Sequence, residues 1–110
     1  MNLCERARES RKRIEEHIRE TPLEPSPLLS QLAGCRVSLK LENFQETGSF
    51  KLRGVLSKLT AMSGKELSRG IITASTGNHG LATARAAALL GVEAEIVVPE
   101  GASGFRLEAL

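Results

Sequence analysis

Apolar side chains recur at helical spacing in three stretches of the chain. Residues 3–19 surround one apolar stripe with charged side chains, and this stripe consists of Leu3, Ala7, Ile14 and Ile18. Residues 50–62 follow Ser49, a good N-cap, and carry the spaced apolar set Leu52, Val55, Leu56 and Leu59. Residues 78–90 are rich in alanine and are followed by Gly91. The pattern predicts three helices, with a further helix starting at Gly104.

Three short stretches between these helices have the composition of strands. Residues 36–41 alternate polar and apolar side chains, whereas residues 71–74 and 94–98 are short and mostly apolar, as buried parallel strands are. Residues 21–27 hold three of the four prolines and are predicted to form an extended connector. The alternation of strands and helices is typical of an α/β fold with a parallel sheet.

This order also suggests how the chain is organised. We expect residues 1–34 to form an N-terminal helix and an extended connector, and residues 35–110 to form part of a small α/β domain. The last residues lie inside an apparent helix without a stop signal, and three strands make a narrow sheet with open edges. We therefore expect the chain to be a truncated piece of a longer protein.

Composition and charge exclude several classes of function. The net charge of +2 comes from 15 basic and 13 acidic residues, a balance that argues against a nucleic-acid partner. No apolar run approaches the ~20 residues that span a bilayer, so no membrane partner is expected. Cys4 and Cys35 lie far apart, and no cysteine–histidine cluster has metal-ligand spacing. We expect free thiols in a cytoplasmic protein that binds no metal.

Lys51 is the first candidate for chemistry. Ligands of open parallel sheets bind outside the carboxyl ends of the strands, where residues 42–49 are expected to lie. This loop leads to Lys51 in the first turn of a helix, where the helix dipole and the nearby Arg53 favour the neutral amine. The neutral amine is the form that attacks a carbonyl group. Position alone also fits an ordinary surface lysine, which is the commoner case.

A second candidate is the turn at residues 75–80, Ser-Thr-Gly-Asn-His-Gly, between a predicted strand and a predicted helix. Such a turn offers backbone N–H groups and hydroxyls to a carboxylate or a phosphate. An ordinary helix capped by Thr76 or Asn78 explains the turn as well, and a lone histidine such as His79 is more often structural. Taken together, the two loops suggest a site for an amino acid and an aldehyde cofactor.

Residues 40–54, KLENFQETGSFKLRG, resemble the lysine segment of the threonine/serine dehydratase family. Members of this family are pyridoxal-phosphate (PLP) enzymes with the tryptophan-synthase-β-like fold. TPL at 21–23 and SPLLS at 26–30 resemble the family's opening segment, ASTGNHG at 74–80 its substrate and cofactor loop, and VPEGAS at 98–103 its next strand end. The resemblance implies a parallel three-layer α/β sheet unit of that fold.

The resemblance also implies a role for each candidate residue. Lys51 would carry PLP as a Schiff base and remove the α-proton of the substrate. Phe50 would pack near the cofactor ring, and Asn78 would donate to its 3′-oxygen. The substrate carboxylate would be bordered by Ser75, Thr76, Gly77 and His79. The implied reaction converts serine or threonine into a 2-oxo acid and ammonia, with PLP as the electron sink.

Two residues bear on the choice within this fold type. His79, where cysteine and threonine synthases usually have Thr, favours the dehydratase branch. Thr76, where serine racemases have Ser, argues against racemisation. Another PLP lyase, a β-replacement enzyme and a non-catalytic truncated remnant remain open as alternatives, whereas the glycine spacing disfavours plain nucleotide binding.

The family's phosphate loop and its partner for the pyridine nitrogen would follow Leu110. We therefore expect the isolated chain to be inactive. As a separate expectation, the full-length form is a homo-oligomer.

Overall fold

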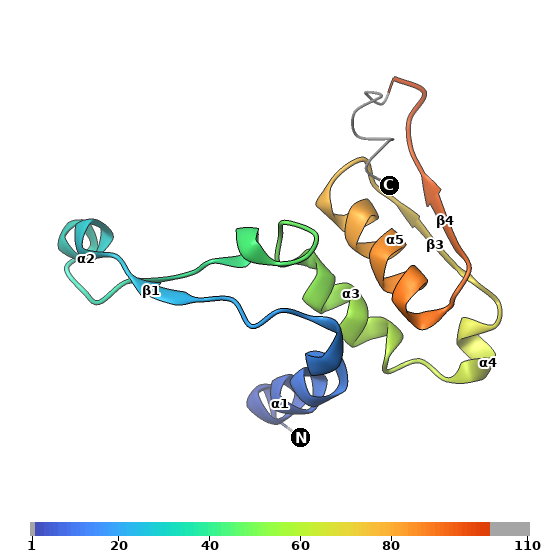
Figure 1. Ribbon diagram of the computed structural model, residues 1–110, viewed down its shortest axis with the longest axis horizontal. Helices are drawn as coiled ribbons and strands as arrows, with labels where there is room; N and C mark the ends of the chain where they lie inside the picture. The colour runs from blue at the N-terminus through green and yellow to red at the C-terminus, as the bar shows by residue number, and fades with distance from the viewer. Residues whose placement is uncertain (1, 102–110) are drawn as a thin grey trace.

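The computed structural model describes residues 2–101, so the helix expected from Gly104 lies outside the described residues. Figure 1 shows a body of helices and strands from which an arm projects. The elements in chain order are α1 (Leu3–Ile14), the 3₁₀-helix η1 (Glu15–His17), β1 (Leu23–Pro25), α2 (Pro27–Ala33), β2 (Ser38–Lys40), the 3₁₀-helix η2 (Glu42–Phe44), α3 (Lys51–Leu59), α4 (Gly64–Leu67), β3 (Ile71–Ala74), α5 (Asn78–Leu90) and β4 (Ala94–Val97).

The three helices predicted from apolar spacing are present. α1 begins with a capping box, in which Asn2 and Glu5 accept each other's backbone N–H groups. α5 has the predicted bounds and ends at Gly91, which adopts a left-handed φ of 64°. α1 ends at Ile14 and α3 at Leu59, both earlier than predicted. None of the helices among residues 2–101 is long and apolar enough to cross a membrane.

The prediction that Ser49 caps α3 is wrong, because Phe50 occupies the cap position in a helical conformation. Ser49 is buried, and its hydroxyl accepts the N–H of Lys51 at 3.4 Å. The preceding Gly48 adopts a positive φ of 68°, which places a turn before the helix, and α3 begins one residue later than the cap pattern suggests.

The predicted single sheet of three parallel strands is also wrong. β2 pairs antiparallel with β1, with Leu23 opposite Lys40 and Pro25 opposite Ser38. The connector predicted at residues 21–27 therefore contains a strand, and its pairing spans the boundary expected after residue 34. Alternating side chains identify a strand but not its partner, and an edge position tolerates the proline that argued against a strand.

Strands β3 and β4 form the parallel pair that the sequence predicted, with Ile71 opposite Ala94 and Ala74 opposite Val97. α5 connects the two strands and packs against both of them. A parallel pair needs such a crossover, and here it confirms the predicted α/β class.

The short helix α2 was missed by the sequence analysis, although its signals are present. Ser26 caps the helix by accepting the N–H of Leu29, Pro27 is its first residue, and Gly34 ends it with a φ of 66°. Proline was taken as a sign of extended chain, but at the first position of a helix it has no hydrogen bond to lose.

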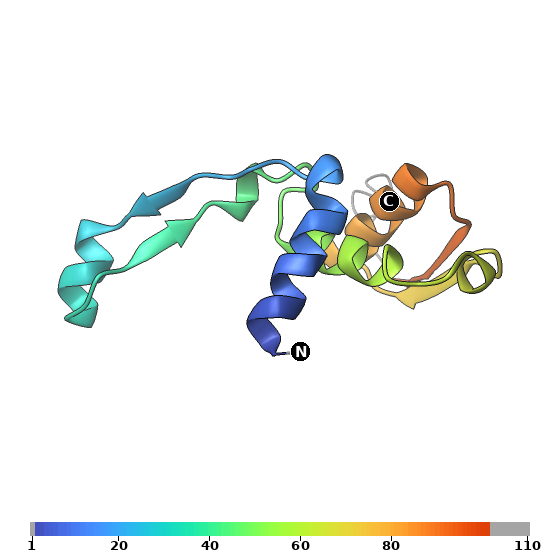
Figure 2. The same ribbon diagram turned by 90° about the horizontal axis from the view of Figure 1, so that it is seen from below.

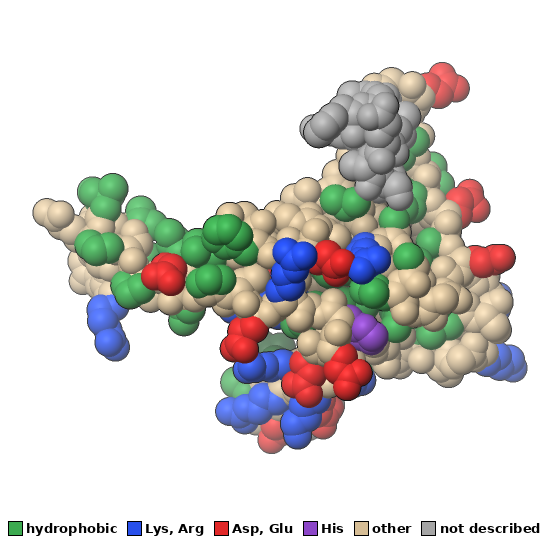
Figure 3. All heavy atoms as spheres, in the orientation of Figure 1, with side chains coloured by type: hydrophobic (Ala, Val, Ile, Leu, Met, Phe, Trp, Pro, Cys, Tyr) green, Lys and Arg blue, Asp and Glu red, His purple; other side chains and the backbone are tan. Residues whose placement is uncertain are grey.

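The core lies where α3 packs between α1 and α5 (Figure 2). Leu52 and Leu56 of α3 are fully buried, and they pack with Ile14, Val55, Leu59, Ala82 and Ala86. The arm of β1, α2 and β2 has a different surface, on which hydrophobic side chains gather in Figure 3. Its exposed leucines are Leu23, Leu28, Leu29, Leu32 and Leu39.

Candidate functional site

An open cleft of about 590 Å³ lies between α3 and β3. One face of α3 forms a wall, because residues three, four and seven positions after Lys51 share its side of the helix. The α3 side of the cleft is lined by Lys51, Gly54, Val55, Lys58 and Leu59. Residues 70–73, His79 and Thr83 line the other side, so the cleft contains Lys51, which follows the first loop that the sequence singled out, and His79 of the second.

Lys51 is the first residue of α3, and its side chain is exposed to the cleft. Its Nζ lies 5.0 Å from the centroid of the Phe50 ring, which is a cation–π distance. Within residues 2–101, no carboxylate is within ion-pair distance of this Nζ, and Lys51 uses only its backbone in a hydrogen bond. The amine is thus accessible to a ligand in the cleft.

Arg53 is paired with a carboxylate of the lysine loop. Its guanidinium is held by Glu42, which accepts from Nε at 2.8 Å and from Nη2 at 2.9 Å. The hydroxyl of Thr21 donates to the same carboxylate. Hydrogen bonding from Arg53 lowers the pKa of Glu42 below its ordinary value of 4.5. Desolvation by burial opposes this shift. The hydrogen bond from Thr21 and the positive charges of Arg53 and Lys40 lower the pKa further.

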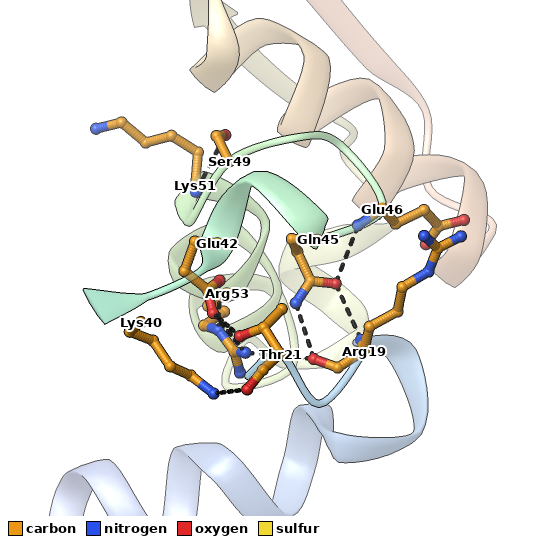
Figure 4. A network of polar contacts seen from close by, with 9 residues as sticks. All are labelled: Arg19, Thr21, Lys40, Glu42, Gln45, Glu46, Ser49, Lys51 and Arg53. Atoms are coloured by element: carbon orange, nitrogen blue, oxygen red, sulfur yellow. Dashed lines mark hydrogen bonds and ion pairs between the residues drawn. The ribbon is translucent and has the colours of Figure 1, made fainter. Parts of the chain in front are cut away.

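Gln45 holds the middle of the lysine loop. Its side chain, only 3% exposed, accepts the N–H of Arg19 at 2.9 Å and donates to the carbonyl of Arg19 at 3.0 Å. It also accepts the N–H of Glu46 at 3.2 Å. Figure 4 shows these contacts, with the Lys51 side chain directed away from them. The adjacent Glu46 pairs with Arg85 of α5 at 2.5 Å, so the loop is fixed on two sides.

The turn at residues 75–79 leaves the start of α5 open. Gly77 is the N-cap and no side chain caps the helix, so neither Thr76 nor Asn78 has the capping role considered from the sequence. The N–H of Ser75 donates to Val97 at the end of β4, and its hydroxyl accepts the N–H of Gly77 at 3.2 Å. Uncapped N–H groups at a helix start favour an anion.

The structure brings some of the predicted site residues together in one cleft. Phe50, Lys51 and His79 line it, whereas Ser75, Thr76, Gly77 and Asn78 are not among the lining residues. His79 is anchored through its carbonyl, which accepts the hydroxyl of Thr83 at 2.9 Å.

Three residues behind the lysine, Thr21, Glu42 and Gln45, were not identified from the sequence, and Arg53 was identified only through its charge. Polar residues in a loop give no periodic signal, and only the fold reveals that Gln45 and Thr21 are buried. Lys58 was missed as well, although its spacing of seven from Lys51 places both amines on one helix face.

The donor set of this region fits PLP and an amino acid. A free primary amine suits an aldehyde, an aromatic ring and apolar walls suit a planar ring, and an uncapped helix start suits an anionic oxygen. A second amine, Lys58, adds positive charge to the cleft, which suits a phosphorylated ligand.

Comparison with known proteins gives consistent results. The family described as "Pyridoxal-phosphate dependent enzyme" matches residues 14–110. A protein of Sinorhizobium fredii, provisionally named threonine dehydratase, is 52% identical over 87% of the chain and 29% of its own length. The L-threonine ammonia-lyase of Thermotoga maritima is 40% identical over 90% of the chain and 25% of its own length.

Solved structures share the fold. The serine racemase of Dictyostelium discoideum superposes with a TM-score of 0.87 at 40% identity, over 96% of this chain and 34% of that one. The chain therefore spans about a third or less of the length of the relatives it matches.

Proposed function

The chain belongs to the family of pyridoxal-phosphate dependent enzymes, and we propose that it supplies the lysine-bearing region of an ammonia-lyase acting on threonine or serine. The observation that carries this proposal is Lys51, an exposed amine at the first position of α3 in a cleft that it shares with His79. An amine without a carboxylate partner in an apolar-walled cleft is suited to covalent attachment of an aldehyde.

The remaining candidates have supporting roles in this proposal. Phe50 would flank the cofactor ring and Asn78 would donate to a ring oxygen. The substrate carboxylate would be held at the uncapped start of α5 by Ser75, Thr76, Gly77 and His79, since backbone N–H groups there favour an anion. When bound, PLP supplies an electron sink that acidifies the α-carbon of an amino acid.

Lys51 would then serve as the base. Its Nζ would accept the α-proton of the amino acid, and the β-hydroxyl would leave with a proton as water; a water molecule would then hydrolyse the resulting imine to a 2-oxo acid and ammonia. The apolar residues of α3 and β3 that line the cleft, such as Val55 and Ile71, would limit access of water to this amine.

Racemisation is a second candidate, favoured by the match to a serine racemase. The two reactions share removal of the α-proton and differ in whether the proton returns to the other face or the β-hydroxyl leaves. His79 and Thr76 favour elimination, through the resemblance to the dehydratase branch. Grafting residues 1–110 onto the matching remainder of the Thermotoga maritima ammonia-lyase, and measuring 2-oxobutanoate from threonine against D-serine from L-serine, separates the two.

The attachment site can be tested on the chain itself. The purified chain is mixed with equimolar PLP, reduced with borohydride and mapped by peptide mass spectrometry. Its five lysines are Lys12, Lys40, Lys51, Lys58 and Lys65. We expect the label to concentrate on Lys51 and to be lost in Lys51→Ala without moving elsewhere. Equal labelling of all five lysines would contradict the proposed role of Lys51.

The proposal extends to a cytoplasmic, homo-oligomeric enzyme in its full-length form. The free and exposed thiols of Cys4 and Cys35 support a reducing compartment.

A further inference from the structure

The loop that carries the chain into Lys51 is held from behind by a set of side chains with no place in the chemistry. Residues 42–49 contain only the short helix η2 as regular structure, yet Gln45 and Ser49 within them are buried. A loop without a ladder of backbone hydrogen bonds keeps one shape only if side chains fix it. Here that fixing is done by Glu42 and Gln45, together with Arg53 of α3.

We propose that Glu42, Gln45 and Arg53 are positioning residues, which set the direction in which Lys51 enters the cleft. This inference rests on the proposed function of Lys51 as the point of cofactor attachment. The three side chains do not line the cleft, so they would act through the lysine and not on a ligand.

Helix geometry explains how Arg53 acts on Lys51. Two residues advance a helix by roughly 200°, which places Arg53 and Lys51 on opposite faces of α3. Lys51 faces the cleft with Gly54 and Lys58, whereas Arg53 faces the segment Arg19–Thr21. When Arg53 anchors one face of the first turn of α3, the opposite face, which carries Lys51, is held in the direction of the cleft.

The pair between Arg53 and Glu42 is suited to this role because it resists rotation. Two parallel N–H···O bonds define a plane, whereas a single bond from a lysine would leave the helix free to turn. The side chains are only 29% and 14% exposed, which limits competition from water. Thr21 also donates to Glu42, and Lys40 donates to the carbonyl of Thr21, which extends the anchor to β2.

Gln45 contributes a separate anchor to the same segment. Its amide both accepts from and donates to the backbone of Arg19, whereas an ionised carboxylate of that size could only accept. Glu42 and Gln45 thus fasten the loop to residues 19–21 at two points, the first residue of η2 and the residue that follows it, while Glu46 fastens the loop to α5 through Arg85.

The cleft contains an internal reference for testing this idea. Lys51 and Lys58 line the same cleft from the same helix face, but Lys58 lies two turns beyond the anchored end of α3. The ratio of pyridoxyl label on Lys51 to that on Lys58, after reduction with borohydride, compares two amines within one molecule. At one fixed equimolar dose of PLP, it is not affected by differences in the amount of protein recovered.

The test uses the variants Glu42→Gln and Arg53→Lys of the 110-residue chain. Arg53→Lys retains the charge, so it keeps the fold more surely while losing the planar pair. Glu66→Gln is the matched control. The pKa of Glu66 is also lowered by hydrogen bonds, first from the side chain of Ser63 and second from its backbone. Glu66 lies in α4, away from the lysine loop. Circular dichroism gives the folded fraction of each protein.

If the inference holds, the Lys51:Lys58 ratio falls about tenfold in Glu42→Gln and Arg53→Lys at an unchanged folded fraction, and is unchanged in Glu66→Gln. A ratio that stays at the wild-type value, or that falls only as far as the folded fraction falls, would overturn it and leave the role of Lys51 intact. A wild-type chain without preference for Lys51 would instead overturn the proposed function, and the inference with it.

Discussion

Arg53 reaches back eleven residues to Glu42 and donates to both of its carboxylate oxygens, at 2.8 and 2.9 Å. The pair lies behind Lys51, on the opposite side of α3 from the cleft. The residue expected from the sequence to act on the lysine by its charge also fastens the lysine loop through Glu42. Its environment leads to the first of four testable predictions.

The contribution of Glu42 to stability should disappear in acid. Its pKa is lowered below 4.5 in the folded chain, mainly by the hydrogen bonds from Arg53, so the folded state prefers the ionised form. The stabilisation is therefore present above the unfolded pKa and is lost as the pH falls through the folded pKa. Urea unfolding of wild type and Glu42→Gln should give a difference in free energy that is constant above about pH 6 and shrinks below pH 4.5. A difference that grows in acid would refute this.

Gln45→Ala should destabilise the chain by about 1–3 kcal/mol, because the partly buried N–H and carbonyl of Arg19 lose their partners. The free energy of unfolding in urea measures this cost. Gln31→Ala is the control, because Gln31 is exposed on α2, and its effect should stay within about 0.5 kcal/mol. Equal effects of the two substitutions would show that the Gln45 contacts contribute nothing.

Alanine should have opposite effects at two glycines where an added methyl group would meet only open space. Gly91→Ala should cost roughly 1–2 kcal/mol, because its φ of 64° is a left-handed conformation. Gly54→Ala should stabilise by roughly 0.5–1 kcal/mol, because Gly54 lies inside α3 with ordinary helical dihedrals. Thermal unfolding followed by circular dichroism gives both signs, and a destabilised Gly54→Ala would contradict the bounds of α3.

Leu56→Ala should destabilise the chain by about 2–5 kcal/mol, because Leu56 is fully buried where α3 meets its neighbouring helices. Leu32→Ala, at a leucine of the arm that is 75% exposed, removes the same atoms without opening a cavity. Its effect should stay within about 0.5 kcal/mol. Comparable losses in the two variants, measured by denaturant unfolding, would show that the arm packs as part of the core.

Local patterns were sufficient wherever one stretch of chain decides its own structure. The bounds of α5 follow from an alanine-rich run that ends at Gly91, and β3 follows from a short apolar stretch. The same reasoning failed at Pro27, where a residue that breaks helices begins one, and at Ser49, which lies one position too early to cap α3. At Pro27 the residue types do signal a helix once Ser26 is taken as its cap, whereas at Ser49 the conformation of Gly48 and Phe50 determines where the helix begins.

The sequence by itself determined the α/β class, the family and the identity of Lys51 as the candidate amine, because these depend on residue types at fixed spacings along the chain. Only the tertiary structure decided that β2 pairs with β1, that Lys51 shares a cleft with His79, and that Gln45 and Glu42 fasten the lysine loop to residues 19–21. Strand partners and buried polar contacts join residues far apart in the chain. These contacts form because buried backbone N–H and C=O groups need hydrogen-bond partners. Which groups become buried is decided by the fold, so no local sequence pattern predicts the contacts.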